Sequence, residues 1–223
     1  MAVALLLACA LLLSACGSDT KEKAASTPTA TDTPEPAQTA GCQKVAKPQP
    51  GNKAKLPKPT QKLKSGKTYV AHVATSCGTF DITLDPKRAP ITGGSFASLV
   101  SKHFYDDLTF HRIVAGFVIQ GGDPKGDGSG GPGYSVVERP PSDLSYTKGV
   151  VAMAKTATDP AGASGSQFFV VTGEDAGLPP EYALLGKVTK GQDVVDKIGV
   201  LAVGSDEAPT QPVVIRQIRI TVS

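Results

Sequence analysis

An arginine and a glutamine in a strongly apolar stretch are the first side chains of this sequence that could do chemistry. Arg112 and Gln120 lie within Tyr105–Gly122, which reads YDDLTFHRIVAGFVIQGG. Burying an arginine among aliphatic and aromatic neighbours is costly unless a partner satisfies its charge and its donors. Two interpretations follow: Arg112 forms a structural ion pair, or it directs fixed hydrogen-bond donors into an apolar groove.

The same stretch predicts two short strands, Phe110–Val114 and Phe117–Gln120. Successive side chains point to opposite faces of a strand. Strict alternation therefore places Arg112 on the same face as Phe110 and on the opposite face from Ile113.

Short β-rich runs separated by turns recur from about Thr68 to the end of the chain. Two helices are predicted among them, Pro90–Lys102 and a shorter one at 191–198, although Gly93 and Gly94 weaken the first. Many short strands with few helices favour a closed antiparallel barrel. The predicted strands are 69–75, 79–84, 110–114, 117–120, 134–138, 149–154, 167–172, 182–188 and 213–222.

A glycine-rich loop at Gly121–Gly133 and a serine at Ser164 are the other candidate sites. The loop lacks the Gly-Lys-Ser/Thr ending and the following helix of a phosphate-binding loop, and it lacks the acidic spacing of a calcium loop. Ser164 lacks the paired glycines of a nucleophile elbow. We therefore predict a long flexible turn at the loop and no serine hydrolase.

Length and charge limit the class of protein. The chain has 223 residues, 24 glycines, 18 prolines and a formal net charge of +3. The part after about Lys67 is long enough to form one folded domain with a sizeable core. A small charge without a basic stripe between aromatic residues argues against a nucleic-acid partner.

The chain begins with an apolar segment, Ala2–Leu13, that is too short to span a bilayer. It predicts a signal peptide over residues 1–15. The sequence Leu-Ser-Ala-Cys at its end resembles a bacterial lipobox, which implies cleavage before Cys16 and attachment of a lipid with acyl chains such as palmitate. No Lys or Arg precedes the apolar run, although signal peptides usually begin with a positive segment. An ordinary secreted protein is the alternative.

Residues 16–66 are rich in Pro, Thr, Ala and Lys and contain almost no large apolar residue. Such a segment cannot bury enough surface to offset its ordering entropy, so we expect a lipidated, disordered tether before a folded domain at 67–223. The lysines either form a solvated linker or contact anionic lipid or wall polymer. They are Lys44, Lys47, Lys53, Lys55, Lys58, Lys62, Lys64 and Lys67.

Two of the four cysteines remain for the folded protein. Cys9 lies in the predicted signal peptide and Cys16 would be lipidated, which leaves Cys42 and Cys77. Outside the cytoplasm these thiols can form a disulfide that joins the end of the tether to the domain, and two free thiols are the alternative. The spacing fits no metal site.

The order of five sequence blocks carries a family resemblance. FHRIVAGFVIQGG, a glycine-rich loop, VAMAK, GSQFFV and LLGKV follow one another between about Thr68 and Ser223. This pattern resembles the cyclophilins, the cyclosporin-binding class of peptidyl-prolyl cis–trans isomerases. The resemblance implies a mainly β fold, a closed eight-stranded antiparallel barrel capped by two short helices. It also implies an enzyme that acts on proline-containing polypeptides with no cofactor and no metal.

The resemblance also assigns residues to a catalytic site. Arg112 matches the catalytic arginine, whose guanidinium would donate to the prolyl nitrogen as the amide twists. Gln167 matches a supporting group, while Phe168 and His111 match structural positions. The residues matched to substrate binding are Phe117, Val118, Gln120, Ala154, Lys155, Gln167, Phe169, Leu178 and Tyr182.

Two positions depart from the family pattern. Gly177 stands where many members have a tryptophan at the pocket rim, and Tyr182 stands where many have a histidine. Because that tryptophan contacts cyclosporin in the family, we expect cyclosporin to bind only weakly. We predict a monomer, anchored to the outer face of the bacterial cytoplasmic membrane or secreted if unprocessed, that accelerates the folding of exported proteins. The alternative is a non-catalytic chaperone module that binds proline segments.

Overall fold

The computed structural model describes residues 41–49 and 55–223, so the predicted signal peptide and the lipidation site at Cys16 lie outside the described residues. The described residues form ten strands and two helices. The elements are β1 (Tyr69–Thr75), β2 (Gly78–Leu84), α1 (Pro90–Ser101), β3 (Leu108–Val114), β4 (Val118–Asp123), β5 (Val136–Val137), β6 (Val150–Met153), β7 (Ala163–Ser164), β8 (Phe168–Val171), β9 (Leu184–Lys190), α2 (Gln192–Gly199) and β10 (Val214–Val222).

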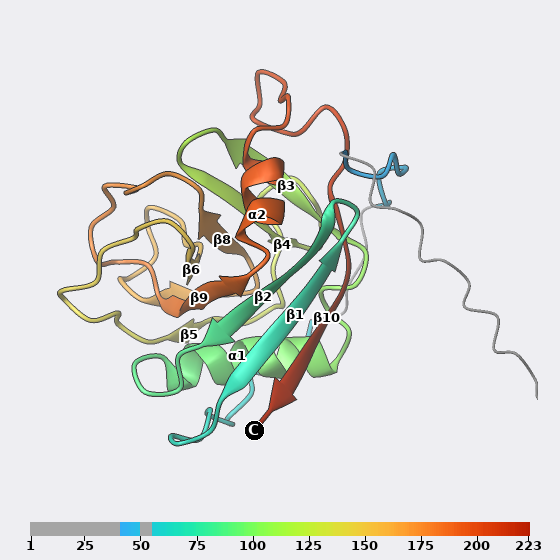
Figure 1. The fold of residues 1–223 in the computed structure, drawn as a ribbon. Coiled ribbons are helices and arrows are strands. Elements are labelled where there is room, and N and C mark those ends of the chain that lie inside the picture. Colours follow the sequence, from blue (N-terminus) through green and yellow to red (C-terminus); the bar gives the residue numbers. More distant parts are fainter. Residues whose placement is uncertain (1–40, 50–54) are drawn as a thin grey trace, which may run out of the picture. The chain divides into compact units, whose positions relative to one another are not determined.

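Eight strands close an antiparallel barrel in the order β1–β10–β3–β4–β8–β6–β9–β2, and β2 pairs again with β1. In Figure 1, β1, β2 and β10 lie side by side, with α1 and α2 near opposite ends of these strands. Within the described part of the chain, neither helix is long and apolar enough to cross a membrane. The predicted mainly β fold, with a closed eight-stranded antiparallel barrel and two helices, is confirmed.

The barrel interior is filled by one face of each strand. Alternation sends Val151 of β6, Ile119 of β4 and Phe168 of β8 into one buried cluster. Tyr105 packs edge-on against Phe168 with ring centroids 5.8 Å apart. Phe96 meets the same ring at 6.0 Å, so α1 covers one side of this cluster.

The strand predicted at 134–138 is not part of the barrel. Only Val136–Val137 is a strand, and it pairs with β7 in a separate two-stranded sheet. Glu138, at the end of the predicted strand, contacts α1 instead. The carboxylate of Glu138 accepts the backbone N–H groups of Ile91 and Thr92 at 3.0 and 2.7 Å, which caps the start of α1.

A β-bulge in β3 overturns the strict alternation predicted around Arg112. The register with β4 shifts between Phe110 and Arg112, which leaves His111 as an extra residue in the strand. The faces therefore exchange after the bulge, and Phe110 and Ile113 both enter the barrel core. The prediction that Arg112 shares a face with Phe110 is wrong.

The chain before Thr68 contacts the barrel, which differs from the expectation that order begins near that residue. We call residues 41–49 and 55–66 the arm. Leu63 is 7% exposed and belongs to the barrel core, and its N–H donates to the carbonyl oxygen of Pro90 at 2.9 Å. A segment with so few large apolar residues cannot form a core of its own, but Leu63, the partly buried Leu56 and backbone hydrogen bonds attach it to an existing surface.

Gly93 and Gly94, the two residues that weaken the predicted helix, lie beneath the arm. A Cβ at Gly94 would overlap the carbonyl oxygen of Gln61, and a Cβ at Gly93 would overlap the side chain of Leu63. The loss of helix propensity, about 1 kcal/mol for each glycine, therefore accompanies close passage of the arm over α1.

We expect Gly94→Ala to displace the arm from α1 and to leave the barrel folded. The added methyl group would meet the backbone of Gln61, which cannot move aside unless the arm shifts. Trypsin should then cleave the Lys62–Leu63 bond faster than in the wild type. Gly131→Ala is the matched control, because a Cβ there would meet no atom within 4 Å in the part of the chain that the structure describes. Equal cleavage rates in the two variants would contradict this packing.

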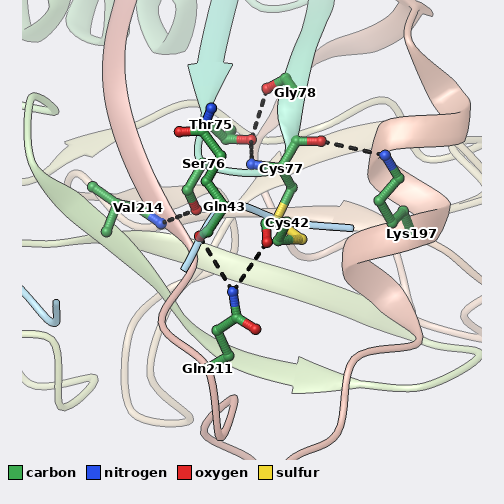
Figure 2. Close-up of a disulfide and its surroundings, with 9 residues drawn as sticks. All are labelled: Cys42, Gln43, Thr75, Ser76, Cys77, Gly78, Lys197, Gln211 and Val214. Atoms are coloured by element: carbon green, nitrogen blue, oxygen red, sulfur yellow. Dashed lines mark hydrogen bonds between the residues drawn. A yellow bond between two sulfur atoms is a disulfide. The ribbon is translucent and has the colours of Figure 1, made fainter. Parts of the chain in front are cut away.

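A disulfide joins the arm to the turn between β1 and β2. Cys42 and Cys77, which the sequence left either paired or free, are bonded in the structure (Figure 2). The N–H of Gln43 donates to the carbonyl oxygen of Ser76 at 2.7 Å. The side-chain amide of Gln211 donates to the carbonyl oxygens of Cys42 and Gln43 at 3.3 and 3.2 Å (Figure 2). The arm is therefore fixed at this point by one covalent bond and several hydrogen bonds.

Candidate active site

The strand faces that point away from the barrel interior carry predicted substrate-binding residues. Val118 and Gln120 on β4 flank the core residue Ile119, and Phe169 on β8 follows the core residue Phe168. Gln120 lies opposite Phe169 in the ladder between these strands. Side chains alternate along each strand, so the residues between those that fill the core lie together on the outer face.

A cavity of about 190 Å³ opens on this outer face. Its lining comes from β3, β4 and β8, from the turn before β4, from the two residues that follow β6, and from the loop between β8 and β9. Of the ten residues that the sequence analysis assigned to catalysis and substrate binding, all but Gln167 line this cavity. They are Arg112, Phe117, Val118, Gln120, Ala154, Lys155, Phe169, Leu178 and Tyr182.

Aromatic packing gives the cavity a well-supported apolar wall. Phe169 is 3% exposed, and the ring of Tyr182 meets it edge-on with centroids 5.5 Å apart. Tyr146 supports this pair, since its hydroxyl donates to the carbonyl oxygen of Tyr182 at 2.6 Å and accepts the N–H of Tyr182 at 3.0 Å. The wall can therefore receive a small apolar group without rearranging the backbone.

The guanidinium of Arg112 borders the cavity from β3. The bulge turns this side chain away from the barrel core. Its Nε donates to Oε2 of Glu207 at 2.6 Å, and the two side chains are 34% and 46% exposed. A guanidinium has five N–H donors, so one bond through Nε leaves the Nη donors for other acceptors. The interpretation as an ion pair is therefore confirmed. Arg112 also lines the cavity, and the direction of its remaining donors toward a bound group stays a prediction.

The ammonium group of Lys155 lies over the ring of Tyr182. Its Nζ lies 5.5 Å from the centroid of that ring and 3.5 Å from Oε2 of Glu181. The side chain of Lys155 is 6% exposed, so its stem packs against protein while the ammonium group is paired. The sequence analysis assigned Lys155 to substrate binding, and the structure shows that its side chain also packs against the aromatic wall of the cavity.

Gln167 connects this cavity with a larger one. Its side-chain oxygen accepts from Nε2 of Gln120 at 3.0 Å, and its Nε2 donates to the carbonyl oxygens of Gly128 and Gly130 at 2.8 and 2.9 Å. The second cavity, of about 500 Å³, includes Gln167 and shares three lining residues with the first. The two cavities are therefore neighbours on one surface.

The glycine-rich loop beside the second cavity is held by a buried carboxylate, which differs from the predicted flexible turn. Asp123 is 1% exposed and accepts backbone N–H groups from Lys125, Asp127 and Gly128 at 2.8, 3.1 and 2.5 Å. The glycines let the backbone wrap around this side chain, because a Cβ at Gly130 would overlap it.

His111 does not line the cavity of Arg112. Within residues 41–49 and 55–223, neither nitrogen of its ring has a hydrogen-bond partner. Burial lowers the pKa of His111 below its usual value, which favours the neutral ring. These features agree with a structural position rather than with an acid or base for substrate.

Residues 70–220 match the family model described as cyclophilin type peptidyl-prolyl cis-trans isomerase/CLD.
The chain belongs to the cyclophilins.
It is 36% identical over 180 residues to a probable peptidyl-prolyl cis-trans isomerase A of Mycobacterium leprae, and this match covers 73% of this chain and 96% of the relative. It is also 36% identical over 172 residues to peptidyl-prolyl cis-trans isomerase A of Mycobacterium tuberculosis, and this match covers 69% of this chain and 93% of the relative.

A crystal structure of a cyclophilin-type isomerase from Cryptosporidium parvum, in the presence of the dipeptide Ala-Pro, superposes with a TM-score of 0.64 and 28% identity. It covers 68% of this chain and 98% of that one. The protein is therefore a cyclophilin-type peptidyl-prolyl cis–trans isomerase, and the cyclophilin family binds proline-containing peptides.

Gly177 directly precedes Leu178, which lines the cavity. Its φ is +61°, and a Cβ there would meet no atom of the described residues within 4 Å. No side chain therefore covers the cavity from this position. Weak binding of cyclosporin stays a prediction.

Three side chains that shape the site were not predicted from the sequence: Glu207, Glu181 and Tyr146. Each acts through a contact with a residue far along the chain or in a loop, such as the 95-residue separation between Glu207 and Arg112. None of the three lies in a family block or in a periodic strand, so no pattern singles it out.

We expect the free energy of unfolding to fall as the pH rises from about 10 to about 12. Burial raises the pKa of Tyr146 from 10.0 to about 12, and it raises that of Tyr105 well above its usual value. The unfolded chain then releases these protons first, so the stabilisation is complete below the unfolded pKa and is lost as the pH rises through the folded pKa. Denaturant titrations at a series of pH values measure the slope of the free energy of unfolding against pH. Tyr146→Phe should flatten it, and an unchanged slope would show that Tyr146 is not the group responsible.

Proposed function

We propose that this cyclophilin uses Arg112 and the apolar wall of the cavity to twist the X-Pro bonds of exported polypeptides as they fold outside the cytoplasmic membrane. The observation that carries the proposal is a single cavity that Arg112 lines together with Phe169 and Val118. Resonance gives the peptide bond a rotation barrier of ~18–20 kcal/mol. A site that fits the twisted amide better than either planar form lowers this barrier.

The roles of the residues follow from their chemistry. The proline ring would pack against Phe169 and Val118, which are almost fully buried and exclude water from one side of the bond. As the bond twists, the lone pair localises on the prolyl nitrogen, which becomes a hydrogen-bond acceptor. The Nη donors of Arg112 would bond to it there and not in the planar amide. An interaction made mainly in the transition state raises kcat.

The neighbouring cavity offers room for the rest of the substrate chain. Gln120 and Lys155 line both cavities, so a peptide whose proline occupies the first would extend along the glycine-rich loop. The related isomerase from Cryptosporidium parvum was crystallised in the presence of Ala-Pro, which supports a short X-Pro segment as the recognised unit. The X residue would lie toward the larger cavity.

The place of action is proposed from the sequence alone. The short apolar segment that ends at Cys16 would direct export and lipid attachment, and the following segment would hold the barrel away from the membrane. Clients would then be polypeptides that emerge on the outer face.

A strain that carries Arg112→Ala at the native locus tests this function. We expect the variant to be present in the membrane fraction at the wild-type level, while exported proteins with slow proline-limited folding stay protease-sensitive for as long as in a deletion strain. Full complementation by Arg112→Ala would instead favour a chaperone that binds proline segments. Cys16→Ala should release the protein into the soluble fraction, and retention at the membrane would contradict the anchor.

A further inference from the structure

An acidic side chain from a distant loop holds the arginine of the cavity. Glu207 lies in the loop between α2 and β10, and its Oε2 accepts the Nε–H of Arg112 at 2.6 Å. Glu207 does not line the cavity that includes Arg112. Its carboxylate therefore binds the guanidinium without occupying the space proposed for substrate.

Backbone hydrogen bonds fix Glu207 beside β3. The N–H of Ile113, the residue after Arg112, donates to the carbonyl oxygen of Glu207 at 2.9 Å. The N–H of Glu207 donates to the carbonyl oxygen of Gly204 at 3.1 Å, and the N–H of Gly204 donates to that of Ala208 at 2.9 Å. The loop is a closed turn, and its main chain and one side chain attach to two consecutive residues of β3.

The backbone at Glu207 is unusual for its residue type. Its φ is +61°, in the left-handed region that glycine and asparagine adopt more readily than glutamate. Such conformations persist where the surroundings determine them strongly, and they are concentrated at functional sites. Glycine would fit this backbone without strain, so the presence of a glutamate points to a use for its carboxylate.

We propose that Glu207 is a positioning residue for isomerisation, one that fixes the plane of the Arg112 guanidinium so that its Nη donors face the cavity. The inference rests on the proposed role of Arg112. A free arginine has many rotamers and must lose them when it binds the twisted amide. A bond through Nε removes that freedom before substrate arrives and leaves the Nη donors available.

The Glu207 carboxylate also has an electrostatic effect on catalysis, which opposes the benefit of positioning the guanidinium. Its negative charge offsets the positive charge that attracts the developing lone pair. The side chains of Arg112 and Glu207 are 34% and 46% exposed, so water and salt screen the charge effect. Screening leaves the geometry unchanged, and positioning is therefore the larger effect.

Glu207→Ala and Glu207→Gln in the full chain separate the two effects. Both variants keep a Cβ at the left-handed position, so the backbone strain is the same. Glu207→Ala removes the acceptor and should lower kcat about fivefold to tenfold with little change in KM. Glu207→Gln removes the charge but keeps a side-chain oxygen, and it should retain about half of the activity or more. A rise in kcat in both variants would show that the charge effect is larger and would overturn the proposal.

The double variant with Arg112→Ala distinguishes positioning from general structural support. Glu207→Ala should cause no further loss in that background, because its effect passes through the guanidinium. The same fold-loss in both backgrounds would make Glu207 merely structural. Asp143→Ala is the charge control, since Asp143 is exposed and has no hydrogen bond or ion pair through its side chain among residues 41–49 and 55–223.

The outcomes also separate this inference from the proposed function. Unchanged kcat in Glu207→Ala, together with a large loss in Arg112→Ala, would remove Glu207 from the mechanism and leave Arg112 in place. Full activity in Arg112→Ala would instead remove the basis of both. The denaturation midpoint of each variant shows whether a loss of activity is a loss of folded protein.

Discussion

Arg112→Ala should lower kcat/KM for prolyl isomerisation about a hundredfold, which corresponds to about 2.7 kcal/mol of transition-state stabilisation. The variant loses the donors that would bond to the prolyl nitrogen only when the amide is twisted, while the apolar wall is intact. The loss should therefore appear mainly in kcat. A protease-coupled assay on a proline-containing tetrapeptide, repeated over a range of substrate concentrations, measures both parameters.

Folding should be almost unaffected by this substitution. The ion pair of Arg112 with Glu207 is partly exposed, and such pairs contribute about 0–1 kcal/mol to stability. Arg88→Ala is the matched control, because Arg88 forms an equally short ion pair with Asp85 at 2.6 Å and lies outside both cavities. A near-wild-type rate in Arg112→Ala would remove this residue from the mechanism, and an equal loss in Arg88→Ala would indicate a general effect of removing a surface arginine.

Replacing both Cys42 and Cys77 by alanine should lower the free energy of unfolding by about 3 to 4 kcal/mol, the entropy of closing a loop of this size in the unfolded chain. The two cysteines are separated by 35 residues, and the closed loop contains most of the arm. Cys77 is one of many residues in the barrel core and neither cysteine lines the cavity, so the double variant should still fold and should keep its kcat/KM. Urea titration of the variant and the wild type gives the difference in stability.

The wild type treated with a reductant is the control for this pair of substitutions. Reduction removes only the covalent bond, whereas the double variant also removes the two sulfur atoms. If the bond accounts for the stabilisation, the two losses of stability should be nearly equal. An unchanged midpoint in both cases would mean that the hydrogen bonds of Gln43 and Gln211 fix the arm without the disulfide. A loss only in the double variant would indicate a packing defect at Cys77, which is 5% exposed.

The barrel and most of the cavity could be predicted because both depend on a period of two along the strands. Phe168 and Phe169 are neighbours in the sequence, and one enters the core while the other lines the cavity. Once the register of β4 and β8 is set by burial of one face, the opposite face follows. The family resemblance then assigned chemistry to that face.

Features that depend on pairing between distant segments could not be predicted in this way. The bulge at His111 exists only in the register with β4, and the residues of β3 carry no mark of it. The contact of Glu207 with Arg112 requires a particular loop to lie against β3, which composition does not indicate. The arm shows the same limit, because a segment with too few apolar residues for a core can still attach to a neighbouring surface through Leu63.

The claim that this cavity turns over proline bonds is tested most directly by two-dimensional NMR exchange on an X-Pro peptide with a small molar fraction of the full protein. Catalysis should produce exchange cross-peaks between the cis and trans signals on a timescale of milliseconds to about a second, far faster than the uncatalysed tens of seconds. The same cross-peaks should disappear with Arg112→Ala. Peptide signals that shift on binding but show no exchange would contradict the mechanism and would mean that the cavity only binds proline segments.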